Sequence, residues 1–111
     1  MWDTLYFTIV HHSHNIDPQV AVVTGAGHGI GRCLSLQLSE LGAKVACWDI
    51  DTAGCQETVA QLEAAGGTGL VVNCDVSDRS QVRDAAMTTR TQLGEVTLLI
   101  NNAGASGGGT E

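Results

Sequence analysis

A glycine-rich turn has the spacing that most clearly predicts chemistry in this sequence. It runs from Thr24 to Gly31 as T-G-A-G-H-G-I-G, between a short apolar run and a segment with helical periodicity. Gly25 permits a tight turn, Gly29 lets the backbone approach a pyrophosphate, and Gly31 lets the helix pack closely. Free N–H groups at the start of that helix would face the phosphates. We therefore predict nucleotide binding rather than a plain surface turn, through Gly25, Gly27, His28, Gly29, Ile30 and Gly31.

Two acidic residues follow later apolar runs. Asp49, with Ile50 after it, ends the second run, and a carboxylate there can accept hydrogen bonds from the ribose hydroxyls of an adenosine. The same charge would repel a 2′-phosphate. Asp75, followed by Val76, comes after the third run. The alternatives are a solvated aspartate at the end of a strand for the first, and a turn before a helix cap for the second.

Alternating strands and helices must position these residues. The predicted strands cover 20–24, 44–49, 69–74 and 97–100, and the predicted helices cover 30–41, 52–65 and 80–93. Strands separated by helices of this length imply a parallel sheet with right-handed crossovers. We therefore predict an α/β fold: a partial doubly wound, Rossmann-like parallel sheet of four strands and three helices, with order 3-2-1-4. The handedness places the first two helices on one face of the sheet and the third on the other.

Helical periodicity indicates which side chains face the sheet. The inward-facing residues are Ile30, Leu34, Leu38 and Leu41 in the first helix, Val59 and Leu62 in the second, and Val82, Ala86 and Leu93 in the third. Asp51 or Thr52 can cap the second helix, and Ser77 or Asp78 can cap the third.

The chain divides into three segments by composition. Residues 1–19 form a leader whose order the sequence leaves open, with Leu5–Val10 as a candidate extra strand. Residues 20–104 form a nucleotide-binding Rossmann half-domain, and residues 105–111 form a glycine-rich tail. The leader contains His11, His12 and His14, but a short H-H-x-H run without a fixed scaffold rarely forms a specific site, so we expect no metal site.

The overall composition argues against several classes of function. Hydrophobic residues make up 43% of the 111 residues, which is enough for a core, and the net charge of −7 argues against binding a nucleic-acid backbone or an anionic membrane. Backbone N–H groups can still hold the phosphates of a dinucleotide. The four cysteines lack C-x-x-C spacing, so we expect free thiols in a reducing, cytoplasmic compartment, with Cys33 and Cys47 in apolar segments.

Two motifs together carry a family resemblance. T-G-x-x-x-G-x-G at Thr24–Gly31 and N-N-A-G at Asn101–Gly104 resemble landmarks of the classical short-chain dehydrogenases/reductases. The resemblance covers Val20–Gly104, nearly the whole chain after the leader.

Several residue roles are implied by this resemblance alone. Asp75 would hydrogen-bond the adenine amino group, and Val76 would pack near the ring. Asn102 would stabilise the central sheet, while Ala103 and Gly104 would pass close to the cofactor ribose.

The resemblance also implies a cofactor and a substrate class. Asp49 at the ribose position favours NAD, and NADP-preferring members often have Arg where this chain has His28. NAD is therefore the expected cofactor and NADP the less favoured one, with Arg32 kept as a candidate phosphate contact. Cys47–Asp51 and Gln56–Thr58 resemble the branch that acts on retinoids and hydroxysteroids. A small lipophilic alcohol or ketone is the implied substrate, and membrane association of a full-length relative stays open.

The family's catalytic residues cannot be placed in this sequence. The family uses a serine and a Y-x-x-x-K motif, in which the tyrosine transfers the proton and the lysine lowers its pKa. Here the only tyrosine is Tyr6, the only lysine is Lys44, and Ser106 lies in the tail. We therefore expect no catalytic residue in this chain, which would be a truncated chain inactive by itself.

Two alternative functions remain open, and one physical property is also expected. The first alternative is a non-catalytic dinucleotide-binding or interaction module, and the second is a Rossmann-like methyltransferase, which the two motifs count against. We also expect self-association, because the fourth strand would leave an apolar edge exposed.

Overall fold

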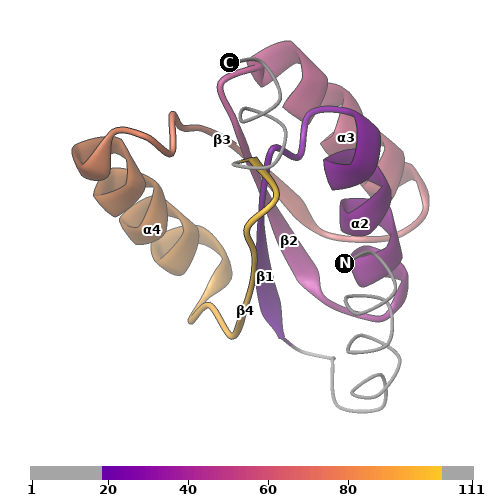
Figure 1. The fold of residues 1–111 in the computed structure, drawn as a ribbon. Coiled ribbons are helices and arrows are strands. Elements are labelled where there is room, and N and C mark those ends of the chain that lie inside the picture. Colours follow the sequence, from indigo (N-terminus) through magenta and orange to yellow (C-terminus); the bar gives the residue numbers. More distant parts are fainter. Residues whose placement is uncertain (1–18, 104–111) are drawn as a thin grey trace.

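The computed structural model describes residues 19–103 as one α/β unit (Figure 1). Its elements in chain order are β1 (Val20–Thr24), α2 (Gly29–Glu40), β2 (Lys44–Asp49), α3 (Thr52–Ala64), β3 (Gly69–Asn73), α4 (Arg79–Leu93) and β4 (Leu98–Ile100). Each bound agrees with the sequence prediction to within one residue. The candidate strand Leu5–Val10, the histidines of the leader, Gly104 and the tail lie outside the described residues.

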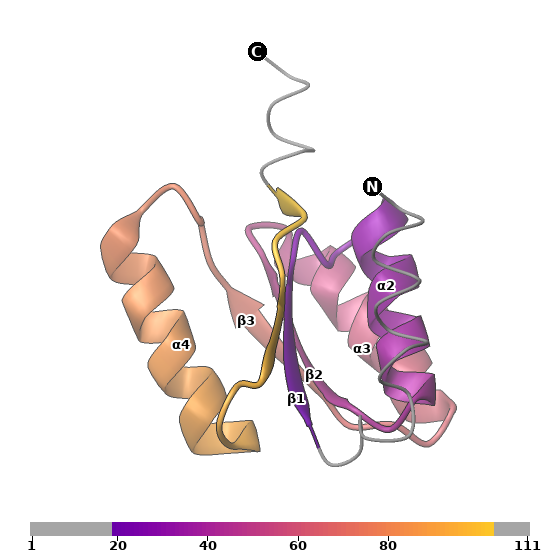
Figure 2. The same cartoon turned by 60° about the horizontal axis from the view of Figure 1, so that its bottom comes forward.

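The sheet is fully parallel and has the predicted order β3-β2-β1-β4. β1 is central and buried along its whole length, because strands lie on both sides of it and helices cover the sheet. Figures 1 and 2 show α2 and α3 on one face and α4 on the other, as right-handed crossovers require. The carboxyl ends of all four strands therefore meet at one edge, where the loops to the helices begin.

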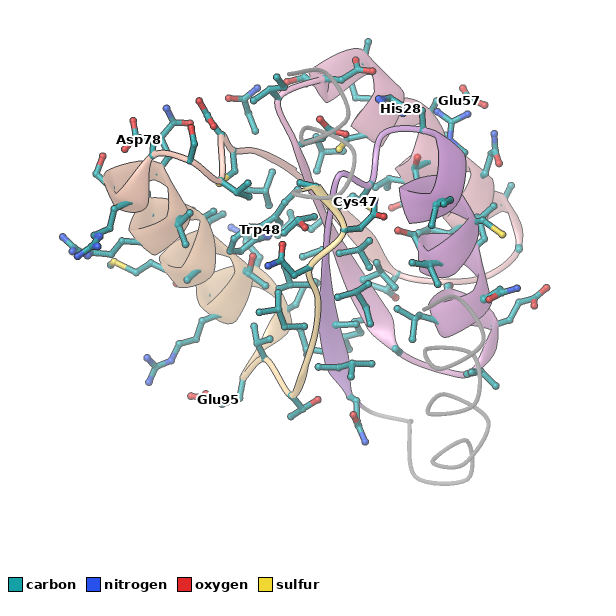
Figure 3. All side chains as sticks on the ribbon, viewed as in Figure 1. His28, Cys47, Trp48, Glu57, Asp78 and Glu95 are labelled. Carbon is teal, nitrogen blue, oxygen red and sulfur yellow. The ribbon has the colours of Figure 1, made fainter. Side chains whose placement is uncertain are left out.

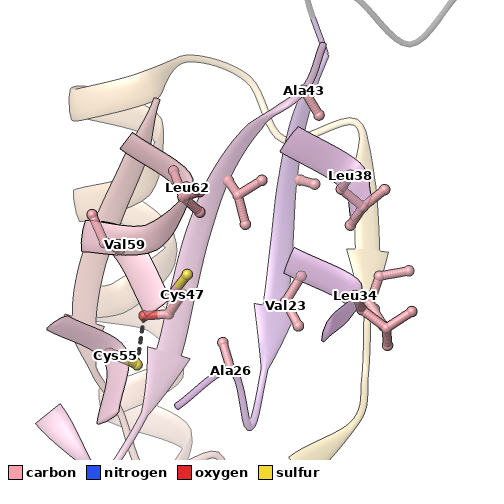
Figure 4. Close-up of a cluster of buried hydrophobic side chains, with 12 residues drawn as sticks. Val23, Ala26, Leu34, Leu38, Ala43, Cys47, Cys55, Val59 and Leu62 are labelled. Carbon is pink, nitrogen blue, oxygen red and sulfur yellow. Dashed lines mark hydrogen bonds between the residues drawn. The ribbon is translucent and has the colours of Figure 1, made fainter. Parts of the chain in front are cut away.

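The larger part of the core lies between the sheet and the α2/α3 layer (Figure 4). Leu34 and Leu38 from α2 and Leu62 from α3 are almost completely buried there, against Val23 of β1 and Val45 of β2. Ile30 was predicted in the same stripe, but it is 46% exposed. It lies in the first turn of α2. Cys33 is exposed as well, on the outer side of α2.

A second cluster lies under α4. Trp48, Val72 and Ala85 are buried together there, with Val82 and Leu93 partly buried against them. The prediction that Ala86 lines this side is wrong, because Ala86 is exposed. The buried residues of α4 are Ala85 and Thr89, four positions apart, so the contact stripe passes through Ala85 and not through Ala86.

Aspartates cap two of the helices. Asp51 accepts a hydrogen bond from the Gly54 N–H at the start of α3, and Asp78 accepts from the Ser80 N–H at the start of α4. Gln19, which the sequence assigned to the leader, accepts a bond from the Lys44 N–H and so continues the pairing of β1. Within residues 19–103, no helix has the length and apolar character needed to cross a membrane.

Candidate functional site

The glycine turn leaves β1 at the carboxyl edge of the sheet and leads directly into α2. Gly25 adopts a positive φ of 66°, and a side chain there would meet the Asn102 amide at 2.9 Å. A side chain at Gly31 would overlap the carbonyl oxygen of Gly25, so the predicted close packing of helix on turn is present. The Ala26 N–H donates to the Trp48 carbonyl at 3.2 Å, which ties the turn to β2.

The start of α2 is open to solvent. His28 is the N-cap in an extended conformation, and its side chain makes no capping hydrogen bond. His28, Gly29 and Ile30 are all exposed, and space lies beside the α-carbon of Gly29, since a side chain built there would meet nothing within 4 Å. Helix N–H groups that lack a capping side chain and face open space can bind an anion.

Asp49 lies against this turn. Its Oδ2 accepts the Gly27 N–H at 2.9 Å, and its Oδ1 accepts the Asp51 N–H at 3.1 Å. The carboxylate is half-buried at the end of β2, and each oxygen keeps a second lone pair for another donor. The Asp49 carboxylate is therefore a negatively charged acceptor that is hydrogen-bonded to the turn and lies next to the N-terminus of α2.

Thr24 is a residue of the site that the sequence analysis did not identify. Its hydroxyl oxygen accepts the Asn102 N–H at 2.8 Å and the Ala103 N–H at 2.9 Å, and the Asn102 side chain donates to the Gly25 carbonyl at 3.4 Å. The N-N-A-G segment is thus joined to the glycine turn, although the two are far apart in sequence. The threonine that opens the T-G motif was the available signal, because a buried hydroxyl needs partners.

Asp75, Val76 and Ile50 lie at the same edge, beside the ends of β2 and β3. The Ser77 hydroxyl and N–H donate to Asp75 Oδ1 at 2.6 and 2.9 Å, and these bonds lower the pKa of Asp75, so its carboxylate is charged at neutral pH. Ile50 is 68% exposed and Val76 is 37% exposed. The loops that follow two neighbouring strands therefore each carry an exposed apolar side chain.

Arg32 does not face the open end of α2. Its guanidinium donates to the Gly27 carbonyl at 2.6 Å, the Gly54 carbonyl at 3.2 Å and the Thr58 hydroxyl at 2.9 Å. The candidate phosphate contact of the sequence analysis is thus engaged between the turn and α3.

Two buried cysteines near this edge, Cys47 and Cys55, have raised thiol pKa values. Burial raises the pKa of the Cys47 thiol to about 11 and, together with the nearby Cys47 thiol and two aspartates, raises the pKa of the Cys55 thiol to about 12. Both thiols are protonated at neutral pH and are therefore poor nucleophiles. In the part of the chain from 19 to 103, no cluster of His, Cys, Asp or Glu is arranged to hold a metal ion.

A pocket also lies between the carboxyl-terminal ends of α2 and α3, lined in part by Ser39, Glu40, Gln61 and Leu62. It is at the opposite end of these helices from the glycine turn. The convergent polar groups lie at the turn, so we place the candidate site there and not in this pocket.

The structure thus brings together nearly all of the predicted site residues at one edge of the sheet. The glycine turn, Asp49 and the Asn102–Ala103 segment are joined by direct hydrogen bonds. Ile50, Asp75 and Val76 lie at the neighbouring strand ends. Gly104 is outside the described residues.

Comparisons with known proteins all match this chain to one family. The sequence model described as short chain dehydrogenase matches residues 19–111. The chain is 38% identical to epidermal retinol dehydrogenase 2 of Homo sapiens over 91 residues, which is 81% of this chain and 29% of that protein. It is 34% identical to estradiol 17-beta-dehydrogenase 11 of Pongo abelii over 90 residues, which is 81% of this chain and 30% of that protein. The chain therefore spans about a third of the length of these curated relatives.

Solved structures agree with the sequence comparison. A hydroxysteroid dehydrogenase from Escherichia coli superposes with a TM-score of 0.78 at 29% identity, covering 81% of this chain and 38% of that one. A short-chain dehydrogenase/reductase from Burkholderia phymatum, determined in complex with NAD, superposes with a TM-score of 0.73 at 39% identity, covering 76% of this chain and 30% of that one.

The family match decides against the methyltransferase alternative, since it covers the glycine turn and every described element. Members of this family are oxidoreductases that bind a nicotinamide dinucleotide. With the sheet order, the turn geometry and these matches in agreement, the chain belongs to the short-chain dehydrogenase family.

Proposed function

We propose that this chain supplies the dinucleotide-binding half of an NAD-dependent oxidoreductase that interconverts an alcohol and a ketone or aldehyde. The observation that carries the proposal is the hydrogen bond from the Gly27 N–H to Asp49 Oδ2 at 2.9 Å. It puts a ribose acceptor next to an uncapped helix N-terminus, which is the pair of features that a dinucleotide needs. The cofactor would carry the hydride, and the residues of this chain would bind and orient it.

The roles of individual residues follow from where they lie. The turn residues Gly25, Gly27, His28, Gly29, Ile30 and Gly31 would surround the pyrophosphate, with N–H groups of α2 as donors. Asp49 would accept the ribose hydroxyls. Asp75 would accept the adenine amino group.

The apolar parts of the adenosine would be covered by exposed side chains. Ile50 and Val76 are exposed in the loops that follow two neighbouring strands, and an adenine ring packed there would remove apolar surface from water. Asn102 would stabilise the central sheet, while Ala103 and Gly104 would pass close to the cofactor ribose.

NAD is the proposed cofactor rather than NADP. The Asp49 carboxylate would repel a 2′-phosphate at the position where it accepts ribose hydroxyls. A cation that could offset this repulsion would have to lie nearby. Arg32, the arginine closest in sequence to the turn, donates to Gly27, Gly54 and Thr58. Its engagement with the protein supports the assignment.

The proposed substrate class is a small lipophilic alcohol or ketone. The support is similarity to proteins named as a retinol dehydrogenase and an estradiol 17-beta-dehydrogenase. We also propose that residues 20–104 are one nucleotide-binding half-domain. A cytoplasmic, reducing compartment fits its four free thiols.

A second candidate, a non-catalytic dinucleotide-binding module, is favoured by one observation. The only tyrosine and the only lysine of the sequence, Tyr6 and Lys44, do not form the Y-x-x-x-K pair that transfers the proton in this family. The 111-residue chain by itself should therefore form no NADH from retinol, hydroxysteroids or secondary alcohols.

A chimera separates the two candidates. Residues 20–103 would replace the matched segment of human epidermal retinol dehydrogenase 2, and NADH formation from retinol would be measured. The oxidoreductase proposal expects activity in this chimera and its loss with Asp49→Ala, while Asp84→Ala, an exposed aspartate on α4, is the control. A folded chimera that binds NAD but turns over no retinol would favour the non-catalytic module.

A further inference from the structure

The guanidinium of Arg32 joins three elements that approach each other at the glycine turn. Nη2 donates to both the Gly27 carbonyl of the turn and the Gly54 carbonyl of α3, and Nε donates to the Thr58 hydroxyl of α3. Three of the five N–H donors of an arginine are thus used inside the protein. The side chain comes from α2, so one residue connects α2, the turn and α3.

Thr58 completes this junction from the side of α3. Its side chain is fully buried, and its hydroxyl accepts from Arg32 while donating to the Ala26 carbonyl at 2.8 Å. The helix can come this close only because Gly54 has no side chain: a Cβ there would meet the Gly27 carbonyl oxygen at 2.5 Å. The contact between the turn and α3 therefore depends on three residues, Arg32, Gly54 and Thr58.

These bonds fix the orientation of two consecutive peptide groups. In the first, the Ala26 carbonyl accepts from Thr58 and the Gly27 N–H donates to Asp49. In the second, the Gly27 carbonyl accepts from Arg32. A planar trans peptide points its carbonyl and its N–H in opposite directions. The His28 N–H is therefore directed away from Arg32, and the Gly27 N–H is held toward Asp49.

We propose that Arg32 and Thr58 are positioning residues that hold the glycine turn and the Asp49 carboxylate in the geometry a dinucleotide requires, without touching the ligand. The inference rests on the proposed function, because it assigns these residues to the same site. A positioning role and a direct phosphate contact predict different effects on NAD affinity. If the two residues position the turn, loss of the uncharged Thr58 hydroxyl should weaken NAD as much as loss of the charged Arg32 side chain.

The test compares matched variants of the 111-residue chain. NAD and NADP are titrated by calorimetry at two salt concentrations against Arg32→Met, Arg32→Lys, Thr58→Val, Thr58→Ser and the double variant Arg32→Met/Thr58→Val. Arg83→Met, an exposed arginine on α4, is the control for loss of one positive charge. Urea unfolding of each variant, measured at the temperature of the titrations, checks that all of them are folded.

The positioning role predicts a specific pattern. Arg32→Met and Thr58→Val should each weaken NAD about tenfold, which is the size expected for loss of a hydrogen bond at a charged or buried group. The double variant should bind nearly as well as the weaker single variant, since both act through one junction. Thr58→Ser should restore binding, Arg32→Lys should restore part of it, and Arg83→Met should bind as the unmodified chain does. The salt dependence of NAD binding should be the same with and without Arg32.

Two results would overturn the proposal. One is normal NAD binding by Thr58→Val together with a reduced salt dependence in Arg32→Met, which would make Arg32 a phosphate ligand. The other is unchanged binding in both single variants.

Amide exchange separates this proposal from the proposed function. If the unmodified chain bound no dinucleotide, the proposed function would fail, and hydrogen exchange would still test the junction. Exchange of the Gly27 amide should then accelerate about tenfold in Arg32→Met and Thr58→Val and stay unchanged in Arg83→Met. An unchanged Gly27 amide in the first two variants would refute the positioning role.

Discussion

The indole N–H of Trp48 on β2 donates to the Thr89 hydroxyl on α4 at 3.1 Å, and both side chains are buried. Figure 3 shows Trp48 lying between the sheet and α4. α4 is the one described helix on its face of the sheet, so this bond is a directional contact in an otherwise apolar interface. It sets the rotation of α4 on the sheet, because Thr89 can reach the indole from one side of the helix only.

Replacing Thr89 by valine should test this contact. The change keeps the shape of the side chain but leaves a buried indole N–H without its acceptor, so the free energy of unfolding should fall by about 1–3 kcal/mol. Urea denaturation measures the loss. Thr88→Val is the matched control, because Thr88 is the adjacent exposed threonine of the same helix. Equal effects at the two positions would mean that the bond contributes nothing to stability.

Asp49 should determine which dinucleotide binds. Asp49→Ala removes the proposed ribose acceptor and should weaken NAD by about 1–3 kcal/mol, while NADP should lose less or gain because the repulsion of its 2′-phosphate is removed. Calorimetric titration of both cofactors measures the ratio of the two affinities. Asp49→Asn keeps one carbonyl acceptor for the Gly27 N–H and separates a structural effect from the effect of charge. Tighter binding of NADP than NAD by the unmodified chain would contradict the assignment.

The buried thiols should make the fold sensitive to alkaline pH. The folded chain holds the Cys47 pKa at about 11, against 9.0 for a free thiol, because burial disfavours the thiolate. A pKa raised in the folded state means that the unfolded chain releases its proton first. The stabilisation is complete below about pH 9 and is lost as the pH rises toward 11. The urea midpoint should fall across that window.

Two cysteine variants identify the source of this effect. Cys47→Ala should make the alkaline decrease in the urea midpoint smaller, with the remaining decrease coming from Cys55, whereas Cys33→Ala should leave it unchanged, since Cys33 is exposed. In the folded chain at neutral pH, a thiol reagent should modify Cys33 well before the three buried cysteines, and mass spectrometry would read out the order. Early modification of Cys47 would show that the core opens readily at β2.

The 111-residue chain should associate through the uncovered part of its sheet. Leu99 of β4 is paired in register with Val22 of β1, and the two point to the face that carries α4. Val22 is 2% exposed whereas Leu99 is 60% exposed, because α4 packs over β2 and β3 and leaves β4 uncovered. An apolar strand at the edge of a sheet can pair with another chain.

Leu99→Lys should therefore lower the apparent mass in light scattering without a large loss of stability. Met87→Lys is the control, since Met87 is equally exposed but lies on α4. A monodisperse monomer of the unmodified chain, with a sharp unfolding transition, would contradict this prediction.

Local patterns in the sequence are enough to specify most of the fold. Buried strands appear as short apolar runs such as Val20–Thr24, and their alternation with helices leaves few topologies once crossovers must be right-handed. The glycine turn and the acidic residue at the end of β2 also follow from spacing, because strand ends in a parallel sheet share one edge. That reasoning placed Asp49 at the end of a strand, and the structure joins it to the turn through the Gly27 N–H.

Contacts between distant segments were decided by the tertiary structure alone. The sequence left Arg32 as a phosphate contact, yet its guanidinium is bound by carbonyls of the turn and α3, which periodicity cannot reveal. The same is true of the Thr24 hydroxyl, whose partners lie more than 70 residues away, and of Ala85 in place of Ala86 under α4. A local pattern predicts which face of a helix or strand is buried, to within about one residue. Side-chain hydrogen bonds depend on ångström-scale placement of packed elements, which only the assembled sheet and helices determine.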